Sequence, residues 1–140
     1  MLKYFKADLA GEFPIRERCM VAELLGDDAV PDMSIARCRV EPGVTTELHS
    51  LKNVREIYVV LSGTGITGDG RAPGQRIDPF DCVLIPAGHP QKVLNDGTKD
   101  LIFIAICTDR FVPECYIPNE GDGAVDPVYP ETPDEPNSQE

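Results

Sequence analysis

The sequence predicts an all-β protein, built as a sandwich or barrel of short strands. Its 140 residues include 12 glycines and 13 prolines but only 5 phenylalanines, 4 tyrosines and no tryptophan, so many turns interrupt short apolar runs. Apolar residues make up 41% of the chain, enough for one packed core in a single domain. No amphipathic pattern longer than two helical turns is present, which argues against a helical fold.

Several segments have the composition expected of strands: they are short, rich in apolar or β-branched residues, and bounded by turn formers. They are Met20–Leu25, Ser34–Val40, Thr45–Leu51, Glu56–Leu61, Gln75–Ile77, Asp81–Ile85, Gln91–Leu94 and Leu101–Cys107. Their even spacing is typical of a sandwich or barrel rather than of alternating strands and helices.

Three of these segments allow more detailed predictions. In Ser34–Val40 the small and apolar residues alternate with larger ones, which predicts that Arg37 and Arg39 face outward. Leu101–Cys107 is wholly apolar, so we expect it at the centre of a sheet. Asn95-Asp96-Gly97 closes the strand before it and is typical of a hairpin turn.

Gly63, Gly65 and Gly68 spell G-x-G-x-x-G after an apolar run, as a dinucleotide-binding turn would. Such a turn must be followed by a helix, whose N-terminus receives the pyrophosphate. The residues that follow, DGRAPGQRIDPF, contain further glycines and prolines and do not predict a helix. We therefore interpret these glycines as positive-φ turns and close strand crossings, not as a nucleotide loop.

The formal net charge of −11 is distributed unevenly along the chain. Seven acidic residues, five prolines and no basic residue lie between Pro118 and Glu140. We expect residues 1–117 to form a single domain and residues 118–140 an acidic, proline-rich tail. No basic patch indicates a nucleic-acid surface, and the arginines at 16, 18, 37 and 39 form either a cationic strip or ordinary solvated strand faces.

Nothing in the sequence indicates a membrane or secreted protein. The longest apolar run, Leu101–Cys107, is far shorter than the roughly 20 residues of a membrane span. The N-terminal residues do not resemble a secretory signal. The five cysteines contain no C-x-x-C pair, and Cys38, Cys82 and Cys107 lie in apolar runs, which favours buried, reduced thiols. We therefore expect a cytoplasmic protein with neither a nucleic-acid nor a membrane partner.

The two histidines of the chain, His49 and His89, mark the candidate site. Residues two apart on a strand share a face, so His49 is expected beside Leu51, Glu56 beside Tyr58, and His89 beside Gln91. If the first residue of each pair points inward, His49, Glu56, His89 and Gln91 converge at one mouth of the barrel. His89, however, lies in a turn between Gly88 and Pro90, where an exposed histidine is the ordinary case.

The spacing of these residues resembles the two sequence motifs of the cupin superfamily, and specifically its small single-domain members. Gly43, His49, Glu56 and Gly63 match the first motif in register. The second motif is matched by Asp81, Pro86, Gly88 and Asn95. The resemblance implies a double-stranded β-helix, or jelly-roll barrel, that is often a homodimer and holds a metal ion or a small ligand inside.

Two of the family's usual metal ligands are missing. Cupins typically bind a divalent metal through three histidines and a glutamate, and His49 and Glu56 occupy two of those positions. Leu51 and Gln91 stand where the resemblance implies the other two histidines. In addition, Phe80 replaces the glycine that usually precedes the acidic residue of the second motif.

Three interpretations of this cluster stay open. In the first, His49, Glu56 and Gln91, with His89 substituting or supporting, hold a divalent iron, manganese, nickel or zinc ion. In the second, the site is metal-free, and Glu56, with a pKa raised by its apolar surroundings, acts as a general acid or base beside His49. In the third, the barrel only binds a small molecule, and His49 and Glu56 form a buried hydrogen-bonded pair.

The resemblance implies a small-molecule-binding protein, but a shared fold does not fix the reaction. If the protein is an enzyme, dioxygenase, isomerase or lyase chemistry on a small polar substrate is implied, with Glu56 and His49 as the catalytic residues. The alternative is a non-catalytic, metal-free ligand-binding or sensor protein. The expected partners are a small molecule and a second copy of the chain in a homodimer.

Overall fold

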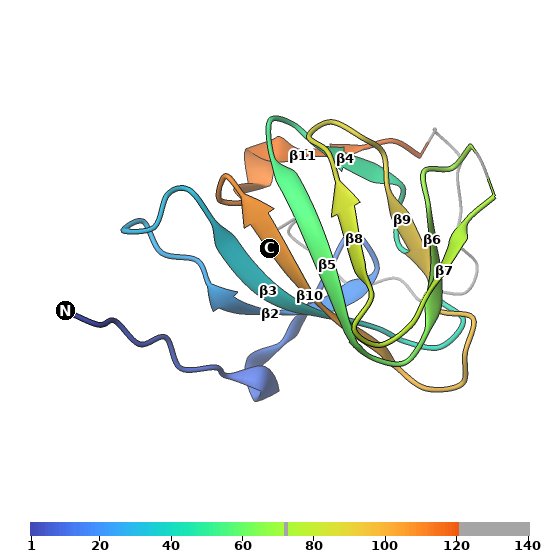
Figure 1. The fold of residues 1–140 in the computed structure, drawn as a ribbon, viewed down its shortest axis with the longest axis horizontal. Helices are drawn as coiled ribbons and strands as arrows, with labels where there is room; N and C mark the ends of the chain where they lie inside the picture. The colour runs from blue at the N-terminus through green and yellow to red at the C-terminus, as the bar shows by residue number, and fades with distance from the viewer. Residues whose placement is uncertain (72, 121–140) are drawn as a thin grey trace.

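Two layers of antiparallel strands face each other around the core (Figure 1). The computed structural model describes residues 1–71 and 73–120. The larger layer is a six-stranded sheet, in the spatial order β1 (Phe13–Ile15), β2 (Cys19–Leu25), β3 (Ser34–Val40), β10 (Leu101–Thr108), β5 (Arg55–Ser62) and β8 (Cys82–Ile85). The smaller layer contains β7 (Gln75–Ile77), β6 (Gly65–Gly68) and β9 (Lys92–Leu94), together with the pair β4 (His49–Leu51) and β11 (Tyr116–Pro118).

The predicted all-β class is confirmed. In the described ranges, the helical elements are limited to single 3-10 turns at Leu9–Gly11 and Pro113–Cys115. None of the helices in this part of the chain has the length and apolar character that crossing a membrane requires.

The core lies between the two layers and follows the alternation of each strand. β10 runs between β3 and β5, which confirms the central position expected for Leu101–Cys107. Its inward residues, such as Phe103, are buried, whereas its outward residues are only partly covered. On β3, Cys38 and Val40 are buried and Arg37 and Arg39 lie on the opposite face, as the alternation predicts.

The hairpin predicted at Asn95-Asp96-Gly97 is wrong. β9, which precedes it, pairs with β6, whereas β10, which follows it, pairs with β3 and β5, so the segment crosses from one layer to the other. The fully buried Asn95 side chain holds this crossing: its Nδ2 donates to the carbonyls of Val40 and Lys99, and its Oδ1 accepts from the Gly97 amide. A sequence typical of a tight turn thus serves a crossover.

The interpretation of the glycines is confirmed at Gly63 and Gly65, which lie at close approaches, but not at Gly68, which has neither a positive φ nor a close neighbour. The chain continues from them into the antiparallel pair of β6 and β7, not into a helix. Gly63 has a φ of +79°, and a Cβ atom added there would lie 2.4 Å from the Asp100 carbonyl oxygen. The backbones approach so closely that only glycine fits.

Two other details differ from the sequence prediction. Thr45–Leu51 forms a regular strand only at His49–Leu51, because the Glu47 amide donates to the Glu17 carbonyl instead of to a neighbouring strand. Cys82 is exposed rather than buried, because it occupies an outward position of β8, whose buried residue is Ile85. The other four cysteines are buried, as expected.

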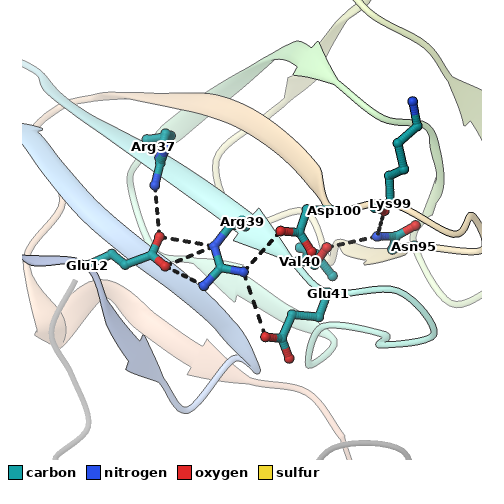
Figure 2. A network of polar contacts seen from close by, with 8 residues as sticks. All are labelled: Glu12, Arg37, Arg39, Val40, Glu41, Asn95, Lys99 and Asp100. Carbon is teal, nitrogen blue, oxygen red and sulfur yellow. Dashed lines mark hydrogen bonds and ion pairs between the residues drawn. The ribbon is translucent and has the colours of Figure 1, made fainter. Parts of the chain in front are cut away.

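The outward arginines are neutralised by carboxylates instead of forming a cationic strip. Glu12 accepts hydrogen bonds from Arg37 Nη2 at 2.9 Å and from Arg39 Nε at 2.9 Å, and Arg39 also reaches Asp100 (Figure 2). Hydrogen bonds from Arg39 hold the pKa of Glu12 below its usual value. Burial opposes this decrease in part, and the charges of Arg39 and Arg37 add to it.

Only the first residues of the predicted tail are described. Pro118 belongs to β11, the Asn119 amide donates to the Leu48 carbonyl at 2.8 Å, and Glu120 pairs with Arg18 at 2.6 Å. The start of the segment is therefore attached to the barrel. Residues 121–140 lie outside the described residues, and their character as a tail stays a prediction.

We expect Glu12→Gln to lower the free energy of unfolding at pH 7 by about 1 kcal/mol, because it removes the charge that Arg37 and Arg39 share. The folded-state pKa of Glu12 is depressed, so this stabilisation exists above the unfolded-state pKa and disappears as the pH falls through the folded value. Urea unfolding at pH 7 and near pH 3 should therefore show the two proteins converging in acid.

Glu41→Gln is the matched control for this measurement. Glu41 also faces Arg39, but at 3.7 Å, and its side chain is 54% exposed. Glu41→Gln should therefore lower the free energy of unfolding at pH 7 clearly less than Glu12→Gln does. Equal losses in the two variants, or a Glu12 effect that does not change with pH, would contradict the assignment.

Candidate functional site

An internal cavity with about 40 Å³ of free volume opens between the two layers. This volume suits about three water molecules or a few ligand atoms. Most of its wall is apolar, including Leu51, Phe103 and Ala105. The polar groups that reach it include Glu17, His49, Glu56 and Tyr58.

His49 is buried and held in one orientation. Its Nδ1 lies 2.6 Å from the Glu47 carbonyl oxygen, which can only accept, so Nδ1 carries the proton and Nε2 is left as the basic nitrogen. Nε2 lies 3.7 Å from Glu17 Oε1. The ring also stacks on Tyr116, with centroids 4.8 Å apart.

A layer of side chains behind His49 fixes this arrangement. The Tyr116 hydroxyl donates to Glu47 Oε1 at 2.6 Å, and Arg16 donates to both Glu47 oxygens at 3.0 and 2.9 Å. Burial, together with the charges of Glu17 and Glu47, raises the pKa of Tyr116, so its hydroxyl keeps its proton. Because β11 pairs with β4, this C-terminal strand supports the histidine directly.

Glu56, Gln91 and Tyr58 form a buried hydrogen-bonded chain. Gln91 Nε2 donates to Glu56 Oε1 at 2.8 Å, and the Tyr58 hydroxyl donates to Gln91 Oε1. Burial raises the pKa of Glu56 from its ordinary value of 4.5 to about 7. The negative charge of Glu17 adds to this shift, whereas His49 and the hydrogen bonds from Gln91 and Cys107 oppose it.

The chain of Glu56, Gln91 and Tyr58 divides the barrel interior. On its far side lies a wider, more open cleft of about 270 Å³, lined by residues of β6, β7 and β8 and by the loop at His89. Tyr58 lines both spaces, while Gln91 lines only the cleft and Glu56 only the cavity.

The structure brings His49, Glu56 and Gln91 together but leaves His89 outside. His49 and Gln91 form a backbone bridge between their strands, and Gln91 bonds Glu56 directly. The side chain of His89 is half-exposed at the rim of the cleft, with Nε2 3.5 Å from Asp69. His89 takes the exposed position expected of a turn residue and does not converge on the cavity, because strand alternation does not hold in the turn before β9.

The residues present do not fit the metal centre that the resemblance implies. The amide oxygen of Gln91, the atom that could bind a metal ion, accepts a hydrogen bond from the Tyr58 hydroxyl. The amide nitrogen of Gln91 donates to Glu56. Leu51 offers no donor. Across residues 1–71 and 73–120, no three His, Cys, Asp or Glu side chains are arranged to hold a metal ion.

Sequence reasoning missed Glu17, Glu47 and Tyr116. Glu17 lies in the turn between β1 and β2, where no strand alternation assigns it a face. Tyr116 reaches His49 only because the chain returns after β10 to pair with β4. Neither short-range spacing nor a motif contains a signal for these contacts.

Comparisons with known proteins agree with this geometry. The family model described as "Cupin domain" matches residues 36–107. The oxalate-binding protein of Thermotoga maritima is 30% identical over 88 residues, which cover 61% of this chain and 72% of that protein.

Two solved structures share the fold. An uncharacterised protein from Klebsiella pneumoniae with a double-stranded β-helix domain has a TM-score of 0.61 and 16% identity, covering 69% of this chain and 82% of its own. The polyketide cyclase RemF from Streptomyces resistomycificus has a TM-score of 0.67 and 18% identity, and the match covers 88% of this chain and 89% of that chain. The double-stranded β-helix expected from the sequence is therefore confirmed.

Glu56→Gln should stabilise the protein in alkaline solution. The folded pKa of Glu56 is raised, so the contribution of Glu56 to stability is fully present below its unfolded pKa and is lost as the pH rises through about 7, while the variant has no such proton to lose. We expect the variant to be more stable by roughly 2–3 kcal/mol at pH 8 and equal to wild type near pH 4, measured by urea unfolding.

Glu41→Gln, which removes an exposed carboxylate, should not become more stable than wild type as the pH is raised from about 4 to about 8. A Glu56→Gln protein that is less stable than wild type at alkaline pH would show that Glu56 is ionised and stabilising when buried.

Proposed function

This chain belongs to the cupin family, and we propose that its barrel binds a small, uncharged polar molecule on which Glu56 and His49 transfer protons. The observation that carries the proposal is a buried carboxyl group with a pKa of about 7 at the same cavity as the basic nitrogen of a fixed histidine. At neutral pH Glu56 is partly protonated, which suits a general acid, and the His49 ring, whose Nδ1 is bound to the Glu47 carbonyl, directs Nε2 as the candidate general base.

Such a pair supports isomerisation. A ligand that gives a proton to His49 Nε2 and receives one from Glu56 keeps its composition and charge, and the two residues are reset by the reverse transfers through solvent. Gln91 and Tyr58 hold the Glu56 carboxyl in place, and Tyr116 and the Glu47 carbonyl hold the imidazole. A lyase reaction would use the same two groups on a substrate with a leaving group.

The charge of the cavity supports an uncharged ligand. Its described lining includes the carboxyl groups of Glu17 and Glu56 but neither lysine nor arginine. A relative is named for binding oxalate, but in this cavity a dianion would face carboxylates without a compensating cation. Direct oxalate binding is therefore disfavoured.

We expect uncharged hydroxyl- and carbonyl-bearing fragments to raise the melting temperature in a thermal-shift screen, and oxalate without added metal to leave it unchanged. His49→Ala and Glu56→Gln should abolish the response, because each removes a group that faces the ligand. His89→Ala is the matched control, since His89 lies outside the cavity and should retain the response. Stabilisation by oxalate alone would contradict the proposal.

Proton transfer is measured separately, by incubating stabilising fragments in D2O and following deuterium uptake at carbon by NMR. We expect uptake with wild type and His89→Ala but not with His49→Ala. Binding without uptake would leave the alternative of a ligand-binding or sensor protein.

Metal content decides between this proposal and the metal centre expected from the resemblance. Elemental mass spectrometry should use protein purified without chelators and without a polyhistidine tag. Near-stoichiometric iron, manganese, nickel or zinc that disappears in His49→Ala would contradict metal-free binding and direct assays toward metal-dependent chemistry, dioxygenation included. We expect no such metal, since Gln91 is engaged with Glu56 and Tyr58.

A further inference from the structure

The open cleft on the far side of Gln91 is a separate space from the cavity, and neither His49 nor Glu56 lines it. One wall is β8, the edge strand of the larger sheet, and the other comes from β6 and from β7, the edge strand of the three-stranded sheet. Its volume of about 270 Å³ is near the lower end of the roughly 300–1,000 Å³ typical of small-molecule sites. The cleft is therefore large enough for a ligand that contains a ring, whereas the cavity of about 40 Å³ suits only a few ligand atoms.

The wall formed by β8 is apolar and partly uncovered. Val83, Leu84 and Ile85 all line the cleft, and Leu84 is 61% exposed. Pro90 adds a further apolar ring to the lining. Covering such side chains with an apolar group removes them from water, which is favourable. This wall is therefore suited to the apolar body of a ligand.

Lys92 brings to the cleft a positive charge that no described carboxylate neutralises. Glu120 lies near enough to be affected by this charge, but it pairs with Arg18 at 2.6 Å. Across residues 1–71 and 73–120, no carboxylate forms an ion pair with the Lys92 ammonium group. A cation beside an apolar wall favours a ligand that carries an anionic group.

Asp69 is the carboxylate among the described residues that line the cleft, and it has other partners. It lies 3.5 Å from His89 Nε2, and its Oδ1 accepts a hydrogen bond from the Arg71 amide at 2.9 Å. The carboxylate is thus directed toward groups of its own loop and of the rim. Lys92 is therefore available to a ligand.

We propose that this cleft is a second binding site, which takes a small monocarboxylic acid with an apolar body. The carboxylate of the acid pairs with Lys92, and its body packs against Val83, Leu84 and Ile85. The proposal does not depend on proton transfer by His49 and Glu56, because those residues line the other space.

The charges of the two spaces differ in the direction that this assignment requires. The cavity is lined by carboxyl groups without a lysine or arginine, which disfavours an acid there, whereas the cleft contains Lys92. The net charge of −11 repels anions from the molecule as a whole, so one carboxylate with apolar contact area is favoured over a polyacid. Oxalate has two carboxylates and no apolar body, and the expectation that it does not bind is unchanged.

Benzoate and its uncharged analogue benzamide test the role of Lys92, with dissociation constants from NMR titration of the full chain. We expect benzoate to bind wild type at millimolar concentrations, and benzamide to bind at least about threefold more weakly. Lys92→Gln should weaken benzoate by a similar factor and remove the difference between the two probes. Lys99→Gln is the matched control, since Lys99 is exposed and lies outside the cleft. A wild type that does not bind benzoate, or equal losses in the two lysine variants, would overturn the proposal.

Leu84→Ser tests the apolar wall without a change of charge. The variant removes an exposed side chain, so it should fold normally and bind both benzoate and benzamide more weakly than wild type. Leu61→Ser is the matched control, because Leu61 is 42% exposed on β5 but does not line the cleft. Benzoate affinity that is the same in wild type and Leu84→Ser would contradict packing on β8.

The position of bound benzoate separates this site from the one proposed at His49. Backbone amide signals of Thr67 and Val83 in the cleft should shift on titration, and those of Ala36 and Ala105 at the cavity should not. His49→Ala should bind benzoate as wild type does, whether or not the cavity binds its own ligand. Shifts confined to the cavity residues, or loss of benzoate binding in a folded His49→Ala protein, would place the acid in the cavity and overturn the second site.

Discussion

The hydrogen-bonded chain of Glu56, Gln91 and Tyr58 joins the two layers of the barrel at their centre. Gln91 belongs to the smaller layer, and its amide bonds one residue of β5 through nitrogen and another through oxygen. A buried amide must have partners for both ends, and two inward residues of one strand supply them. The partition between the cavity and the cleft, and the environment of Glu56, both depend on this arrangement.

Replacing histidine with glutamine at position 91 changes what the site can do. An imidazole there would offer a nitrogen lone pair to a cation, whereas the amide is consumed by its neighbours. Leu51 has no atom that could bind a cation at the second position, and it makes that part of the cavity wall apolar. With fewer opposing charges and less water nearby, the carboxyl of Glu56 is driven toward its neutral form, as the direction of its pKa shift indicates. The same two residues thus remove donors that a metal ion would use and leave Glu56 in apolar surroundings.

The sequence was sufficient for the class of fold, the family and most strands, because those depend on alternation and turn chemistry that are local. It was insufficient where residues far apart in the chain meet. Glu17 reaches His49 from a turn, and Tyr116 reaches it from β11. The same limit explains Asn95, which lies in a segment with the sequence of a tight turn. Its side chain bonds Val40, a residue 55 positions away, and the segment therefore crosses from one layer to the other. His89 stays at the rim of the cleft because strand alternation does not extend into its turn.

The two-residue period of β5 and β10 places different demands on the two faces of the larger sheet. On β5, Glu56, Tyr58 and Val60 face inward and Ile57, Val59 and Leu61 face outward, so both sides of one strand are under constraint. A slip of one residue in its pairing with β10 would bury the outward apolar set and expose the carboxyl of Glu56 to water. The outward set is itself apolar, so hydrophobic burial alone does not fix the register. The buried amide of Gln91 does, because only the native register gives it both Glu56 and Tyr58.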